Sequence, residues 1–297
     1  SEVIDLIGSK EGLFILSQVL LNPGDVSLIP DPSYSVYAMG GKIVGASIEL
    51  MPLLEQNAFL PDFDSIPKEK LKKAKILWLN YPNNPTGAIA DLSFFERAVA
   101  FAREHNLLLA HDAPYCNVGF DGYRAPSILQ VPGAKEVAVE FNSMSKSYNM
   151  AGWRVGMVVG NPDAVKFIET YKGQQDSAIF APLMEAAEAA MLGDQSWLNE
   201  RNRIYQERRD VITDSLHRSG IRIAPPQAAL YVWAPVPGGE SSMDFCARML
   251  NDCGVSTTPG VVFGKHGEGY FRISLVTNID TLREGAERMA AWLERVA

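Results

Sequence analysis

Short apolar segments rich in β-branched residues alternate with longer amphipathic segments along the first half of the chain. This alternation is typical of β-α-β units, which build a mostly parallel sheet. Two amphipathic segments carry end signals of helices, since the first closes at Asn22, Pro23 and Gly24 and the second opens after Asp91. The sequence therefore predicts helices at 11–21 and 92–105 and strands at 26–29, 43–50, 76–79, 107–110, 137–141 and 155–159.

The pattern changes after Pro182, where two helical stretches follow each other. The second, from about 196 to 217, carries a dense mixture of charges and is expected to bridge two domains. Further strands are predicted at 221–224, 230–234 and 270–276, and further helices at 243–252 and from 279 onward. We therefore expect an α/β protein with a large domain over residues 1–195 and a smaller C-terminal α+β domain, including the bridging helix, over 196–297.

Polar residues follow three of the predicted parallel strands, at the edge where open parallel sheets bind their ligands. They are Asn84 after strand 76–79, Asp112 and Tyr115 after strand 107–110, and Ser143, Ser145 and Lys146 after strand 137–141. Each has an ordinary structural explanation when it is taken alone. The segment 84–87 could be only a turn, Asp112 only a helix N-cap and Lys146 only a surface lysine. Their meeting on one edge of the sheet favours a ligand site.

Composition narrows the possible classes of function. A formal net charge of −8 argues against a broad nucleic-acid surface. No apolar run is long enough to predict a membrane span. Cys116, Cys246 and Cys253 form neither a metal-ligand spacing nor an even-numbered disulfide framework. The sequence thus predicts a soluble, cytoplasmic protein with reduced thiols and no metal site.

The ordered set of polar motifs resembles one enzyme family. Asn84-Pro85-Thr86-Gly87, Asp112 with Tyr115, and Ser143, Ser145 and Lys146 with Arg154 are similar to the cofactor-binding residues of the class I/II aminotransferases of fold type I, which use pyridoxal 5′-phosphate (PLP). The spacing of eight residues from Lys146 to Arg154 is also that of the family. The resemblance covers the whole chain and is nearest to the bacterial LL-diaminopimelate and alanine aminotransferase branch. It implies a three-layer, mostly parallel-sheet PLP domain.

The resemblance assigns the chemistry to four side chains. Lys146 is implied to hold PLP as a Schiff base and, once released, to carry the proton between the substrate α-carbon and the cofactor. Asp112 is implied to keep the pyridine nitrogen protonated, because an opposite charge in a poorly solvated site favours the charged form. Tyr115 and Asn84 are implied to donate hydrogen bonds to the phenolic oxygen of the cofactor, with Asn84 also expected at the substrate.

The resemblance also supplies the ligands of the cofactor phosphate. Ser9 and Lys10 lie in a turn before the first predicted helix, and they are implied to bind the phosphate mainly through main-chain N–H groups. The remaining phosphate ligands are implied to be Ser143, Ser145 and Arg154.

Two further positions are implied to contact the cofactor ring and the substrate. Tyr34 stands where the family stacks an aromatic ring on the pyridine. Tyr37 fits a place in the core as well as it fits a contact with the cofactor. Arg272 taken alone could be a strand arginine in a surface ion pair. The glycine-rich stretch 259–270 before it is similar to the family's approach to its substrate arginine. Arg272 is therefore implied to bind the α-carboxylate through two parallel hydrogen bonds.

The chain opens on Ser1, and we expect that it lacks the N-terminal part of the family. In the family that part supplies an arm, a piece of the small domain and residues that reach the partner subunit's active site. The resemblance implies a homodimer that acts on an amino acid and a 2-oxo acid, with neither nucleic acid nor membrane as a partner.

The leading functional hypothesis is an aminotransferase coupled to glutamate and 2-oxoglutarate, with aspartate, alanine or LL-diaminopimelate as candidate amino acids. A carbon–sulfur β-lyase and an aminocyclopropane-carboxylate-type synthase share the fold and the lysine, and they stay open at this point. So does a PLP-binding sensor domain of a transcription regulator, although no winged helix is visible in the sequence. Release of pyruvate and ammonia from a sulfur substrate would distinguish the lyase from the transferase.

Overall fold

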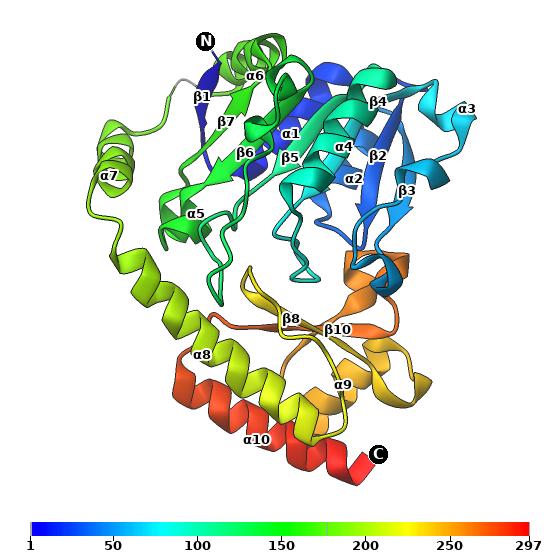
Figure 1. Ribbon diagram of the computed structural model, residues 1–297, viewed down its shortest axis with the longest axis vertical. Coiled ribbons are helices and arrows are strands. Elements are labelled where there is room, and N and C mark those ends of the chain that lie inside the picture. The colour runs from blue at the N-terminus through cyan, green and yellow to red at the C-terminus, as the bar shows by residue number, and fades with distance from the viewer. Residues whose placement is uncertain (1, 177, 297) are drawn as a thin grey trace.

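The computed structural model describes residues 2–176 and 178–296 and arranges them around two β-sheets (Figure 1). The larger sheet consists of β1 (Val3–Leu6), β2 (Val26–Asp31), β3 (Ser47–Pro52), β4 (Ala74–Asn80), β5 (Leu108–Asp112), β6 (Ala138–Ser143) and β7 (Gly156–Gly160). Its strand order is β1-β7-β6-β5-β4-β2-β3. Strands β2 to β6 are parallel, whereas β7 is antiparallel to both of its neighbours. The expected mostly parallel α/β sheet is thus confirmed.

The smaller sheet is antiparallel and has the order β8-β10-β9, with β8 at Tyr231–Pro235, β9 at Thr258–Pro259 and β10 at Tyr270–Ser274. The α-helices are α1 (Ser9–Leu20), α2 (Val36–Ile43), α3 (Lys68–Leu71), α4 (Leu92–Glu104), α5 (Met144–Ser147), α6 (Pro162–Gln175), α7 (Ala181–Leu192), α8 (Trp197–Arg218), α9 (Ser242–Cys253) and α10 (Ile279–Val296). None of the helices in the described ranges is long and apolar enough to cross a bilayer.

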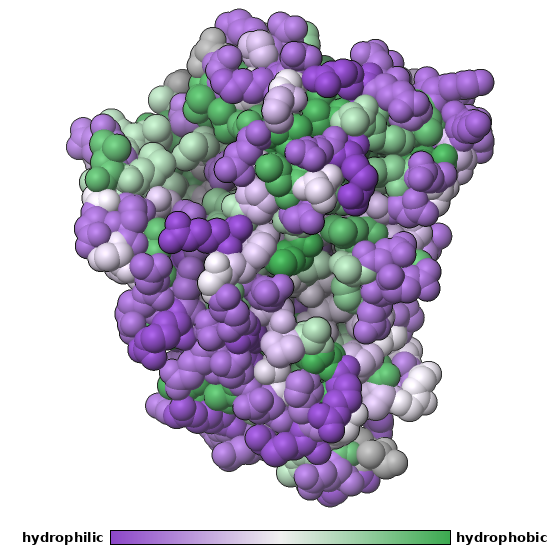
Figure 2. Space-filling view, viewed as in Figure 1, coloured by the Kyte–Doolittle hydropathy of each residue, from purple (hydrophilic) through white to green (hydrophobic). Residues whose placement is uncertain are grey.

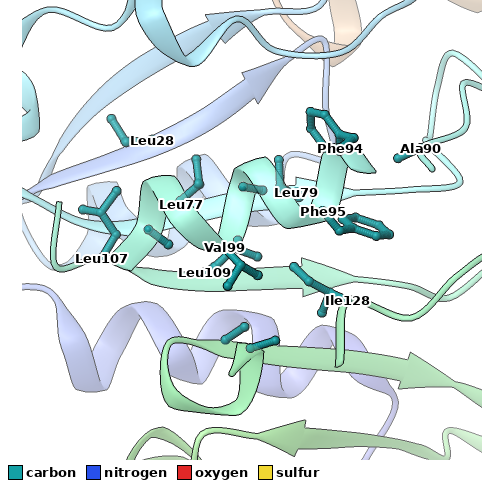
Figure 3. Packing of buried hydrophobic residues seen from close by; sticks show 14 of the residues in the cluster. Leu28, Leu77, Leu79, Ala90, Phe94, Phe95, Val99, Leu107, Leu109 and Ile128 are labelled. Carbon is teal, nitrogen blue, oxygen red and sulfur yellow. The ribbon is translucent and has the colours of Figure 1, made fainter. Parts of the chain in front are cut away.

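Apolar side chains fill both faces of the larger sheet. On one face, α1, α2 and α6 cover a core that includes Tyr37, Trp78 and Phe141. On the other face, α4 inserts Phe94 and Phe95 among leucines of β4 and β5 (Figure 3). Because both faces are covered, the strands are apolar on both sides, as is usual for parallel sheets. At the carboxyl ends of β4, β5 and β6, the polar residues Asn80, Asp112 and Ser143 follow these apolar stretches.

The smaller sheet packs with α8, α9 and α10 around a separate core. Phe245, Phe271 and Trp292 lie at its centre, with Phe245 in contact with both other rings. Helix α8 runs beside α10 at the base of the molecule in Figure 1. Hydrophilic residues dominate the visible surface over this helix pair (Figure 2). The pair therefore buries one face and exposes the other.

Polar contacts join the smaller sheet and its helices to the larger sheet, near the carboxyl ends of the parallel strands. Arg209 of α8 is buried, and its guanidinium forms an ion pair with Asp121. Asp31, at the end of β2, accepts hydrogen bonds from the main-chain N–H and the Nδ1 of His266. These contacts fix the smaller sheet opposite the carboxyl ends of β2, β4, β5 and β6.

Two sequence predictions of secondary structure need correction. Residues 221–224 form no strand. Pro225 and Pro226 lack the N–H groups that a sheet ladder needs, and the carbonyl of Ile223 already bonds to the Nε2 of His217. The strand predicted at 43–50 begins only at Ser47, since the chain turns at Gly45 with a φ of 78°. The edge strand β1 and the helices α2 and α6 were not predicted.

Candidate active site

A cavity of about 460 Å³ lies between the carboxyl ends of the parallel strands and the smaller sheet. It is lined by all eleven residues that the sequence singled out, namely Ser9, Lys10, Tyr34, Asn84, Asp112, Tyr115, Ser143, Ser145, Lys146, Arg154 and Arg272. The register of the sheet explains much of this convergence. Asn80 pairs with Asp112 and Asp112 pairs with Phe141, so the three strands end side by side. The structure thus brings the predicted residues together in one cavity.

The carboxylate of Asp112 is buried at the floor of this cavity. Its Oδ2 accepts a hydrogen bond of 2.7 Å from the hydroxyl of Tyr37, whereas its Oδ1 is buried without a partner in the described residues. Tyr37 stacks on Trp78 with ring centroids 4.9 Å apart, and the indole Nε1 of Trp78 donates to Ser27 Oγ. Tyr37 is therefore both a core residue and the hydrogen-bond donor to the Asp112 carboxylate. Its second role could not be seen in the sequence.

Burial raises the pKa of Asp112 to about 6, against an ordinary value of 3.8. The hydrogen bond from Tyr37 and the neighbouring His111 act in the opposite direction and lower the pKa of Asp112. A buried oxygen without a partner is costly, because it has lost its water and gained no donor. The free Oδ1 therefore fits a cationic N–H donor, such as a protonated pyridine nitrogen.

An anion cradle forms one end of the cavity. Gly8 precedes α1 with a φ of 71°, and a Cβ at this position would overlap the guanidinium of Arg154. Arg154 itself adopts a left-handed conformation, with a φ of 57°, and its Nη1 donates to Ser145 Oγ at 3.3 Å. Ser143 caps the short helix α5. A helix N-terminus facing an arginine and two serines is suited to a phosphate group.

Lys146 lies in α5 and lines the same cavity as Arg154 and Asp112 from a half-buried position. Helix α5 spans four residues, so its last carbonyls have no intrahelical partner. The buried guanidinium of Arg201 donates to the carbonyls of Lys146 and Ser147. Arg201 thereby holds the main chain of the lysine from outside the cavity. Nothing in the sequence distinguished Arg201 from the other charges of α8.

Arg272 reaches the cavity from β10 of the smaller sheet. Its Nη1 donates to Asn84 Oδ1 at 2.7 Å. The guanidinium lies between two aromatic rings, 4.1 Å from the centroid of Tyr231 and 4.6 Å from that of Phe263. Burial lowers the pKa of Arg272, but the guanidinium of an arginine in a protein remains protonated at neutral pH. The arrangement leaves a desolvated cation that is suited to a carboxylate.

The aromatic residues around the cavity form two groups. Tyr34 meets Tyr37 edge to face, and the Nζ of Lys10 lies 5.4 Å from the centroid of the Tyr34 ring. On the other side, the hydroxyl of Tyr115 lies 3.1 Å from the hydroxyl of Tyr231. Tyr231 and Phe263 also line the cavity. Phe263 belongs to the glycine-rich stretch 259–270 that marked Arg272, whereas no sequence motif pointed to Tyr231.

Comparisons with known proteins agree with this geometry. The sequence model of the family "Aminotransferase class I and II" matches residues 1–289. An LL-diaminopimelate aminotransferase of Dehalococcoides mccartyi is 48% identical over 290 residues, which cover 98% of this chain and 75% of that protein. An LL-diaminopimelate aminotransferase of Moorella thermoacetica is 47% identical over 295 residues, covering 99% of this chain and 76% of that protein.

Solved structures show the same similarity. The structure of apo-BacF from Bacillus subtilis has a TM-score of 0.95 and 41% identity, covering 99% of this chain and 78% of that one. A probable N-succinyldiaminopimelate aminotransferase from Thermus thermophilus has a TM-score of 0.92 and 38% identity, covering 98% of this chain and 77% of that one.

The environment of Asp112 predicts an unusual dependence of stability on pH. The pKa of Asp112 is raised in the folded protein, so the folded state binds its proton more tightly than the unfolded state does. Without a ligand, the contribution to folding is present below pH 3.8 and is lost as the pH rises to about 6, a change of about 3 kcal/mol. Asp112→Asn should flatten this part of the curve. Urea unfolding of the ligand-free protein between pH 4 and pH 8 measures the free energy of unfolding along this curve.

The control for this experiment is Asp163→Asn, which changes an exposed carboxylate in the first turn of α6. It should leave the shape of the stability curve as in the parent. An Asp112→Asn curve parallel to that of the parent would show that Asp112 is not the group that titrates.

Proposed function

The chain belongs to the class I and II aminotransferases, and we propose that it uses PLP held on Lys146 to transfer the amino group of LL-diaminopimelate to 2-oxoglutarate. One observation carries the cofactor assignment. Asp112, whose Oδ1 has no hydrogen-bond partner among the described residues, and Arg154 of the anion cradle line the same cavity as Lys146. A pyridinium nitrogen, a phosphate and an aldehyde are the three groups of PLP that these residues fit.

We assign the cofactor contacts as follows. Asp112 would hold the ring nitrogen in its protonated form, and the main chain at Ser9 and Lys10 would bind the phosphate together with Ser143, Ser145 and Arg154. Tyr34 would pack on the ring face. When bound, PLP supplies an electron-accepting ring that stabilises negative charge at the substrate α-carbon.

The protein supplies the proton transfer and the orientation of the substrate. The amine of Lys146 would hold the cofactor and then move the proton at the α-carbon, for which it must lie within reach of that atom. Tyr115 and Asn84 would donate hydrogen bonds near the phenolic oxygen of the cofactor. Asn84 also accepts a hydrogen bond from Arg272, and this contact links the cofactor side of the cavity to the substrate side.

Arg272 would bind the α-carboxylate that every amino acid substrate carries. The rings of Tyr231 and Phe263 exclude water from its guanidinium, so an incoming carboxylate meets a charge in a low-dielectric setting. Fixing the carboxylate orients the α-carbon relative to Lys146. This arrangement serves catalysis through orientation and does not select among side chains.

The proposed amino acid follows from the relatives. Those from Dehalococcoides mccartyi, Natranaerobius thermophilus and Moorella thermoacetica are all named LL-diaminopimelate aminotransferase, at 47–48% identity.

The three free cysteines fit a reducing compartment, and we propose a cytoplasmic homodimer. The division into domains at residues 1–195 and 196–297 also remains a proposal.

A panel of amino donors tests the proposed function. With 2-oxoglutarate as acceptor, LL-diaminopimelate should give stoichiometric glutamate with a higher kcat/KM than alanine or aspartate. The measurement is glutamate formation by coupled assay, with pyruvate and ammonia release from a sulfur amino acid as the counter-assay. Equal rates with all three donors would contradict the assignment of LL-diaminopimelate. Lyase products without glutamate would contradict amino transfer itself.

Replacement of Arg272 should affect all donors alike. Arg272→Ala removes a two-pronged, charge-assisted contact and should lower kcat/KM by about a hundredfold, on the order of 3 kcal/mol. The factor should be similar for every donor in the panel, because each has an α-carboxylate. Arg248→Ala, which removes an exposed partner of Glu240, is the control and should retain parental kinetics. A loss confined to dicarboxylic donors would show that Arg272 binds the side chain of the substrate instead.

A further inference from the structure

Tyr231 contacts both the substrate side and the cofactor side of the cavity. It is the first residue of β8 and is buried. Its ring centroid lies 4.1 Å from the guanidinium carbon of Arg272. Its hydroxyl lies 3.1 Å from the hydroxyl of Tyr115. One side chain of the smaller sheet thus meets two residues that the proposed function places in the active site.

Only one of the two hydroxyl protons can lie between the oxygens of Tyr115 and Tyr231. Each hydroxyl has one O–H donor and two acceptor lone pairs. If Tyr115 donated to Tyr231, it would have no proton left for a ligand in the cavity. If Tyr231 donates, the O–H of Tyr115 is free to point toward the ligand. The role of Tyr115 as a donor therefore depends on the direction of this hydrogen bond.

The phenol of Tyr115 retains its proton at neutral pH. Burial, followed by the adjacent Tyr231, raises the pKa of Tyr115 well above its ordinary value. A protonated phenol that accepts one hydrogen bond becomes a stronger donor in the next, since hydrogen bonds in series polarise one another. Donation from Tyr231 would thus strengthen the hydrogen bond that Tyr115 offers to a ligand.

We propose that Tyr231 is a positioning residue with two separable roles. Its hydroxyl donates to Tyr115 and directs the Tyr115 proton into the cofactor site, and its ring holds the guanidinium of Arg272 for the substrate carboxylate. The proposal rests on the proposed function, because it presupposes PLP in the cavity. A phenylalanine would supply the ring contact alone, so the buried hydroxyl points to the second role.

Two substitutions of Tyr231 separate these roles. Tyr231→Phe removes the hydroxyl and keeps the ring, whereas Tyr231→Leu removes both. The matched control is Tyr81→Phe, since Tyr81 is also buried and its hydroxyl donates to the carbonyl of Phe59, outside the cavity. Two quantities are measured for each PLP-loaded variant: the pH midpoint of the visible absorption band of the cofactor, and the KM for the amino donor.

Tyr231→Phe should raise the pH midpoint by roughly 0.5 to 1 unit, because a weaker donor at Tyr115 stabilises the negative phenolic oxygen less. Its KM should remain within about twofold of the parent, since the ring over Arg272 is retained. Tyr231→Leu should raise the midpoint similarly and also raise KM about tenfold. Tyr81→Phe should change neither quantity.

An unchanged midpoint in Tyr231→Phe would overturn the proposal, as would an equal shift in Tyr81→Phe. So would a Tyr231→Leu variant whose KM matches that of Tyr231→Phe. Failure of the proposed function is distinguishable from these outcomes. In that case the parent itself would show no visible band of bound PLP, and both proposals would fall together.

Discussion

The buried carboxylate of Asp112 imposes the main constraint on this molecule. One of its oxygens is held by Tyr37 and the other has no partner within the described residues. Burial disfavours the ionised form of Asp112 and raises its pKa to about 6. At neutral pH the ligand-free fold therefore carries an unfavourable buried charge. A cation placed at the free oxygen would relieve this cost, so the instability of the empty site contributes to the affinity for its proposed cofactor.

The surrounding structure keeps that carboxylate in place. Tyr37 cannot turn away from Asp112, because its ring is stacked on Trp78 in the core between the sheet and its helices. The parallel register sets Asp112 beside Asn80 and Phe141, and the segments after these strands supply Asn84, Tyr115 and Lys146. The smaller sheet adds Arg272 and Tyr231 from the opposite side. The same packing that stabilises the fold therefore defines the site.

Much of the fold and the site could be predicted because the signals are local in the sequence. Apolar strands followed by polar residues predict a parallel sheet with a ligand at its edge. The family resemblance adds Ser9, Lys10, Tyr34, Arg154 and Arg272, and all eleven predicted residues line one cavity. The roles of Tyr37, Tyr231 and Arg201 could not be predicted. Their partners lie 75, 116 and 55 residues away in the chain, and no local pattern distinguishes them from core or surface residues. Residues 221–224 failed as a strand for a local reason, since His217 of α8, six residues earlier, binds the carbonyl of Ile223.

The central claim is that Lys146 holds the cofactor, and chemical trapping tests it most directly. The PLP-loaded protein is reduced with borohydride and digested, and the peptide that carries the pyridoxyl group is identified by mass spectrometry. We predict that the group lies on Lys146 and that Lys146→Ala yields no reducible adduct. A pyridoxyl group on Lys10, the other lysine that lines the cavity, or on any other lysine, would contradict the account.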